Sequence, residues 1–100
     1  MTDHLFLIAK ITPKSEFYAQ AKAALESILP ATHEEEGCIQ FHMHEGIGEA
    51  AGSFFLYEEW CDEAALALHY EQDYTKAVFA SYQEWLAQAP VISKMRKVGG

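Results

Sequence analysis

The sequence contains few cysteines, few basic residues and no long hydrophobic run. Its two cysteines, Cys38 and Cys61, lack the spacing of a metal or redox motif and are too few for a disulfide-stabilised secreted domain. Seven basic residues against 15 acidic ones leave a net charge of −8, which argues against nucleic acid as a partner. The apolar run at residues 5–9 is too short for a signal peptide or a membrane span. We therefore expect a cytoplasmic protein with no membrane or nucleic-acid partner.

Hydrophobic residues make up half of the chain and aromatic residues 13%. A chain of 100 residues has room for one core only, so residues 1–100 are expected to form a single domain. No linker, repeat or low-complexity segment divides it. In small domains, surplus aromatic residues often line a pocket or a subunit interface.

Periodic apolar residues predict four strands and the helices between them. The expected strands cover residues 4–11, 38–45, 53–60 and 91–98. A first helical segment starts near Ser15 and should kink or end at Pro30, which cannot donate an interior hydrogen bond. Asp62 is expected to cap a second segment, and a third, beginning near Tyr74, should end before Pro90.

Two details of the region around residue 38 can be predicted from local rules. Gly37 is expected to end the preceding helical segment in a left-handed conformation. In the strand that follows, alternation should place Ile39, Phe41 and Met43 on one face.

The order β-α-β-β-α-β predicts an α+β, ferredoxin-like sandwich with an antiparallel sheet covered by helices on one face. The first and third strands carry apolar residues on both faces. A second copy of the chain, packed sheet against sheet, would cover the open face. We therefore expect a homodimer that forms a dimeric α/β barrel.

Two segments carry a family resemblance: HEEEGCIQFHMHE at residues 33–45 and FFLYEEWCDEAALALH at residues 54–69. Together they resemble the antibiotic biosynthesis monooxygenase family, whose members are small dimeric α+β barrels and include cofactor-free quinol monooxygenases. The matching positions are an E-x-W at Glu58 and Trp60, a helix cap at Asp62, an Ala-Leu pair and His69. The family also includes isomerases of phosphorylated diketones and haem-degrading enzymes.

Two departures from the family pattern narrow the function that the resemblance implies. Many members have a Pro-His pair where this chain has Asp73 and Tyr74, so a second imidazole is absent there. Haem-degrading members carry an asparagine on the first strand, where this chain has Ala9, and a further histidine after the position of His69. This chain has no histidine after His69, so the resemblance disfavours haem degradation.

Dioxygen reacts slowly with most closed-shell organic molecules, and a flavin, metal or haem usually assists it. No glycine-rich dinucleotide fingerprint is present. An electron-rich substrate, such as a quinol or polyphenol, can instead pass an electron to O₂ once it is deprotonated. We therefore expect a cofactor-independent monooxygenase, with no cofactor or metal and with O₂ as co-substrate.

This reaction needs a base and an aromatic pocket, and the sequence contains candidates for both. Glu58 alternates on one strand face with Leu56 and Trp60, where burial should raise its pKa. The expected catalytic residues are His69, Glu58 and Trp60, and the expected substrate-binding residues are Tyr74, Phe41, Phe79 and Leu56.

Structural readings of the same residues stay open. Glu58 could pair with Lys10, Trp60 could be a core residue, and Tyr74 could anchor its helix. The pair His42 and His44 lies on one strand face, but it matches no recognised zinc pattern.

Two other functions also remain open. One is a proton-shuttling isomerase of a small carbonyl compound, with Lys10 or Arg96 binding a phosphate group. The other is a non-enzymatic dimeric module that binds an apolar ligand.

Overall fold

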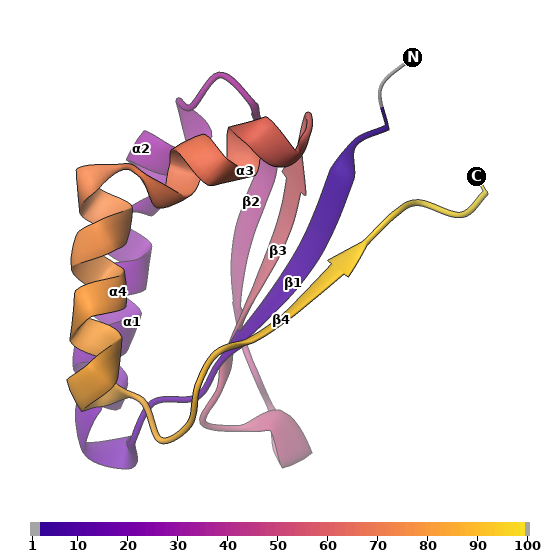
Figure 1. The fold of residues 1–100 in the computed structure, drawn as a ribbon. Helices are drawn as coiled ribbons and strands as arrows, with labels where there is room; N and C mark the ends of the chain where they lie inside the picture. The colour runs from indigo at the N-terminus through magenta and orange to yellow at the C-terminus, as the bar shows by residue number, and fades with distance from the viewer. Residues whose placement is uncertain (1–2, 100) are drawn as a thin grey trace.

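The computed structural model describes residues 3–99 and contains a four-stranded antiparallel sheet with its four α-helices packed on one face (Figure 1). The strands are β1 (Leu5–Ile11), β2 (Cys38–Glu45), β3 (Phe54–Trp60) and β4 (Val91–Met95), in the sheet order β2-β3-β1-β4. The helices are α1 (Tyr18–Ser27), α2 (Leu29–His33), α3 (Glu63–Tyr70) and α4 (Asp73–Trp85). The predicted ferredoxin-like order is confirmed, with each helical connection broken into two helices. No helix within residues 3–99 combines the length and the apolar content needed to cross a membrane.

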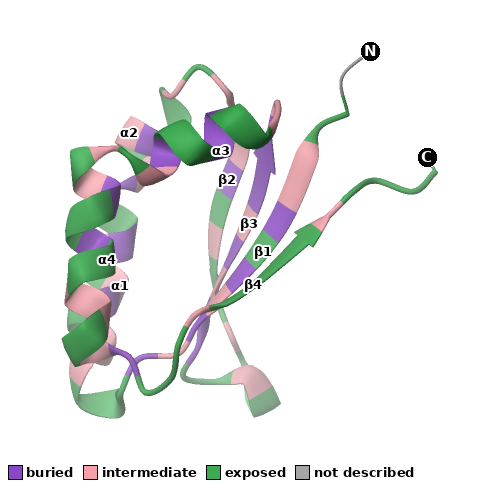
Figure 2. Cartoon of the chain, viewed as in Figure 1, coloured by how far each residue is buried: buried purple, intermediate pink, exposed green. Residues whose placement is uncertain are grey.

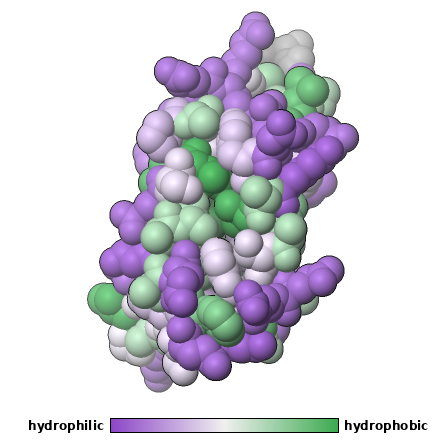
Figure 3. All heavy atoms as spheres, turned by 90° about the vertical axis from the view of Figure 1, so that its left-hand side faces the viewer, coloured by the Kyte–Doolittle hydropathy of each residue, from purple (hydrophilic) through white to green (hydrophobic). Residues whose placement is uncertain are grey.

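The core lies between the sheet and the helices. The central strands contribute the inward side chains of Leu7, Ala9 and Ile11 from β1 and of Phe54 and Leu56 from β3, all 5% exposed or less. Figure 2 shows buried positions along β1 and β3, whereas the edge strand β4 is exposed along most of its length. On the face of the molecule that the helices form, hydrophilic side chains occupy much of the outline, and hydrophobic and intermediate ones gather toward the centre (Figure 3).

Local sequence signals set the helix boundaries. The first helical connection breaks at Ile28, between α1 and α2, and Pro30 occupies the first turn of α2, where the missing N–H has no intrahelical partner. The Asp62 side chain caps α3, because its Oδ1 accepts a hydrogen bond of 2.8 Å from the backbone N–H of Ala65. Both predictions are confirmed.

A β-bulge at the start of β2 changes which residues face the core. The register with β3 shifts between Cys38 and Gln40, so Cys38 lies opposite Trp60 while Phe41 lies opposite Glu58. The extra residue is Ile39, which is 45% exposed. The prediction that Ile39 joins Phe41 on the buried face is wrong, because the bulge interrupts the alternation and Cys38 takes the inward position.

Gly37 is required for close packing rather than for a left-handed turn. Among residues 3–99, only Gly48, Gly52 and Gly99 have positive φ angles, so the predicted left-handed cap at Gly37 is wrong. A Cβ atom at Gly37 would lie 2.3 Å from the Cβ of Ala65 on α3. The chain approaches this closely because the Gly37 carbonyl accepts a 2.9 Å hydrogen bond from the backbone N–H of Cys61.

We expect Gly37→Ala to lower the free energy of unfolding by about 1–3 kcal/mol, since the added methyl group overlaps Ala65. Urea denaturation measures this loss. The control is a double-mutant cycle with Ala65→Gly, which removes the clashing Cβ. The loss caused by Gly37→Ala should shrink in that background, and an equal loss in both backgrounds would contradict the packing explanation.

Candidate functional site

A cavity of about 180 Å³ lies between the sheet and the helices. Its walls are mainly apolar and include the predicted substrate-binding residues Phe41, Leu56 and Phe79. Five polar side chains also line it: Glu58, His69, Tyr70, Thr75 and Tyr82. The cavity therefore brings together two of the three predicted catalytic residues and three of the four predicted substrate-binding residues. Trp60 and Tyr74 lie outside its lining. Trp60 contacts the lining residues Glu58 and His69, and the Tyr74 ring packs near that of His69.

Glu58 is a carboxylate in the apolar wall of the cavity. Alternation along β3 turns it toward the helices, and it is 4% exposed. Burial raises its pKa to about 7; the hydrogen bond from Trp60 opposes this shift, and the charge of Glu35 adds to it. Lys10 does not pair with it, because Lys10 lies opposite Phe55 on the other face of the sheet. Glu58 can therefore both take up and release a proton near neutral pH.

Trp60 is a fully buried residue that holds two of the polar groups in place. Its indole Nε1 donates a 2.9 Å hydrogen bond to Oε1 of Glu58. Its ring centroid lies 4.8 Å from that of His69, at an interplanar angle of 37°. The N–H is thus already used within the protein, and the ring fixes the position of the imidazole.

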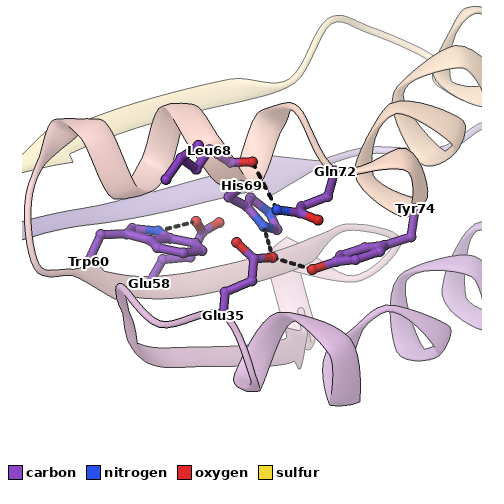
Figure 4. A network of polar contacts seen from close by, with 7 residues as sticks. All are labelled: Glu35, Glu58, Trp60, Leu68, His69, Gln72 and Tyr74. Atoms are coloured by element: carbon purple, nitrogen blue, oxygen red, sulfur yellow. Dashed lines mark hydrogen bonds and ion pairs between the residues drawn. The ribbon is translucent and has the colours of Figure 1, made fainter.

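His69 is held by a carboxylate that the sequence analysis missed. Its Nδ1 lies 2.7 Å from Oε2 of Glu35, and the Tyr74 hydroxyl donates to the same oxygen (Figure 4). Burial raises the pKa of Tyr74, and the hydrogen bond to Glu35 raises it further, so the phenol stays protonated as a donor. Because a carboxylate only accepts hydrogen bonds, Nδ1 carries the proton. Nε2 is then the ring nitrogen left to accept a proton from a ligand.

Glu35 is hard to identify from sequence, because it stands in the run Glu34-Glu35-Glu36 after α2. Such a run normally indicates a solvated surface. Glu35 points toward α3 and α4 only because the folded chain brings these helices beside it. The inward position of Cys38 is equally hidden in the sequence, because it depends on the β-bulge. Burial raises the pKa of the Cys38 thiol to about 11, and the charges of Glu35 and Glu58 add to the shift, so the thiol is neutral and a poor nucleophile.

The two histidines of β2, His42 and His44, are exposed and lie away from this cavity. Within the described part of the chain, no three His, Cys, Asp or Glu side chains cluster in a way that could hold a metal ion.

The fold and the cavity define a ferredoxin-like α+β domain with a largely apolar internal site that contains a buried carboxylate and an oriented histidine. The family model for the antibiotic biosynthesis monooxygenases matches residues 5–81. The chain belongs to the antibiotic biosynthesis monooxygenase family.

Individual relatives agree with this assignment. The Bacillus subtilis (strain 168) protein "Putative monooxygenase YcnE" is 29% identical over 82 residues, which cover 82% of this chain and 81% of that protein. A solved structure of a conserved protein from Methanosarcina mazei Go1 matches with a TM-score of 0.87 and 28% identity, covering 97% of this chain and 95% of that one. Protein PA3566 from Pseudomonas aeruginosa matches with a TM-score of 0.90 over 99% and 98% of the two chains; at 24% identity, it supports the fold alone.

We expect the free energy of unfolding of the wild type to fall relative to that of Glu58→Gln as pH rises from 5 to 8. The folded pKa of about 7 exceeds the ordinary value of 4.5, so the folded state holds the proton more tightly. This stabilisation is fully present below about pH 4.5, is lost as pH rises through about 7, and amounts to at most about 3 kcal/mol.

Urea denaturation of both proteins at several pH values measures this difference. Glutamine keeps an oxygen that can accept the Trp60 N–H, so the comparison isolates the charge. Parallel pH profiles for the two proteins would show that Glu58 titrates normally.

Proposed function

We propose that the protein is a cofactor-independent monooxygenase that oxidises a small electron-rich aromatic compound, such as a quinol or polyphenol, with O₂. The observation that carries the proposal is the pairing of two proton-accepting groups in one apolar cavity. Glu58 has a pKa of about 7, and His69 is oriented by Glu35 with Nε2 left to accept a proton. Family membership supports the reaction class.

The reaction begins with removal of the phenolic proton of the substrate by Glu58 or His69. The resulting anion passes an electron to O₂, and the radical pair combines at a ring carbon. Loss of water then gives a hydroxylated quinone. For hydroquinone, C₆H₆O₂ and O₂ give C₆H₄O₃ and H₂O, so atoms and electrons balance without an external reductant. The protonated phenols of Tyr70 and Tyr82, whose pKa values burial raises, can donate hydrogen bonds to oxygen atoms in the cavity.

The isomerase alternative lacks its anion-binding group in this cavity. Lys10 lies on the outer face of the sheet, and Arg96 lines a separate hollow on that face. No lysine or arginine side chain within residues 3–99 lines the inner cavity. A phosphorylated substrate would therefore enter a largely apolar site without a lysine or arginine to pair with its phosphate group, which is unfavourable.

We expect the wild type to consume O₂ with hydroquinones, and His69→Ala to reduce kcat/KM by about 100-fold or more, because a positioned base contributes at least this factor. The rate should rise with pH through about 7 as Glu58 loses its proton. An oxygen electrode with a panel of hydroquinones measures both effects.

Leu68→Ala is the matched control, since Leu68 precedes His69 on α3 and its side chain is 64% exposed. Its rate should equal that of the wild type. Uptake that is unchanged in both His69→Ala and Trp60→Phe would remove these residues from the mechanism. Ligand binding without any turnover would favour the non-enzymatic module.

We further propose that a second copy of the chain covers the outer face of the sheet. This face carries Phe6 and Ile8 from β1, Phe55 and Tyr57 from β3, and Met95 from β4. Ile8 is 37% exposed although it lies on a central strand. These apolar side chains lie among polar ones such as Lys10 and Glu59. A cluster of apolar side chains on an open sheet face is typical of a subunit interface.

Sedimentation equilibrium should give twice the chain mass for the wild type and the single-chain mass for Ile8→Lys, because the variant places a charge in the middle of the apolar face. Leu68→Lys adds the same charge on the helical face and should remain dimeric. A wild type that sediments as a monomer contradicts the proposed interface.

A further inference from the structure

Thr75 is a buried polar group that the mechanism above does not use. It lies in the first turn of α4, is 1% exposed and lines the cavity. Its hydroxyl has no hydrogen-bond partner within residues 3–99. Leaving a buried hydroxyl unsatisfied costs about 1–3 kcal/mol, so a native protein that keeps one generally has a use for it.

The Thr75 hydroxyl does not bond to a backbone carbonyl of its own helix, as helical threonines commonly do. A threonine in a helix commonly bonds to the carbonyl three or four residues earlier; for Thr75 only the carbonyl three residues earlier, that of the N-cap Gln72, belongs to α4. Thr75 makes no such bond. Valine would fill the same space without an unsatisfied oxygen, so packing alone does not account for threonine at this wall of the cavity.

Thr75 and Glu58 belong to opposite layers of the fold. Glu58 comes from β3 in the sheet and Thr75 from α4 in the helical layer, and both line the same cavity. A ligand in the cavity therefore lies between a residue of the sheet and a residue of the helical layer.

The volume of the cavity limits the size of that ligand. An engineered protein cavity of about 150 Å³ lined by apolar side chains binds benzene. The present cavity measures about 180 Å³, which suits one aromatic ring with small substituents.

We propose that Thr75 determines specificity by hydrogen-bonding the second oxygen of a monocyclic aromatic diol whose first oxygen meets Glu58. The inference rests on the proposed function, since it assumes that this cavity is the substrate site. It narrows the substrate class from quinols and polyphenols to single-ring compounds with two oxygen substituents.

The test compares two ligands and two proteins that each differ by one hydroxyl. Hydroquinone and 4-methylphenol differ by a hydroxyl replaced with a methyl group, and so do the wild type and Thr75→Val. Anaerobic NMR titrations give each dissociation constant without turnover. Thr75→Val should weaken hydroquinone binding about five- to tenfold and change 4-methylphenol binding less than twofold, because only the diol has a second oxygen for Thr75.

Two further variants serve as controls. Thr75→Ser keeps the hydroxyl and should bind hydroquinone as the wild type does. Thr32→Val makes the same change at a second buried hydroxyl, which does not line the cavity; it should leave both affinities unchanged. In the absence of ligand, Thr75→Val should unfold at the same urea concentration as the wild type or a higher one, since no internal hydrogen bond is lost.

The proposal is overturned if Thr75→Val changes the dissociation constants of both ligands equally, or changes neither. The second result is also the one expected if the hydroxyl binds only water. Loss of stability in Thr75→Val without ligand would likewise overturn it, by indicating an internal partner. The oxygen measurements are independent of this outcome. Diol-selective binding without O₂ uptake contradicts the monooxygenase function alone, whereas uptake with no ligand-specific effect of Thr75→Val contradicts only the role of Thr75.

Discussion

The buried carboxylate of Glu58 is the constraint around which the site is arranged. Moving an ionised carboxylate out of water is costly unless it is paired, and within residues 3–99 the only hydrogen bond to this side chain comes from Trp60. The resulting rise in pKa to about 7 means that the fold tolerates the group by holding its proton more tightly. Such an arrangement lowers stability at neutral pH and is typical of functional sites, where a group must exchange protons under working conditions.

The second carboxylate, Glu35, has a different environment and therefore a different part in the site. It accepts hydrogen bonds from His69 and Tyr74 and does not line the cavity. Its partners connect the loop before β2 to α3 and α4, so it holds the imidazole in one orientation as the fold closes. Its charge also contributes to the raised pKa of Glu58. In the proposed mechanism, one carboxylate thus orients a base, while the other lines the cavity and acts as a base itself.

Much of this arrangement could be predicted from sequence because it depends on local rules. Alternation along β3 places Glu58 with Leu56 and Trp60, and the cap at Asp62 fixes the start of α3 and thereby the position of His69. These signals operate within a few residues, so one sequence is enough to find them.

The features that the sequence could not reveal depend on contacts between distant segments. The bulge turns Ile39 outward, and Cys38 takes the inward position instead. Gly37 is needed because Ala65 of α3 packs directly against it. Glu35 resembles its exposed neighbours Glu34 and Glu36 until α3 and α4 pack beside it. Thr75 resembles any helical threonine until the cavity beside it is known. In each case the decisive partner lies far away along the chain.

The edge strand β4 links the two faces of the sheet and so connects the proposed interface to the proposed chemistry. It pairs with β1 alone, and most of it is exposed. Ile92 lines the inner cavity, whereas Met95 lies on the outer face with Phe6. A second copy packed on the outer face would restrict the motion of a strand that is otherwise held on one side only. Dimer formation would then also hold Ile92 and Pro90 in place at the cavity wall. Because a preformed apolar cavity binds its ligand without a further ordering cost, the interface would contribute to catalysis without supplying a catalytic residue.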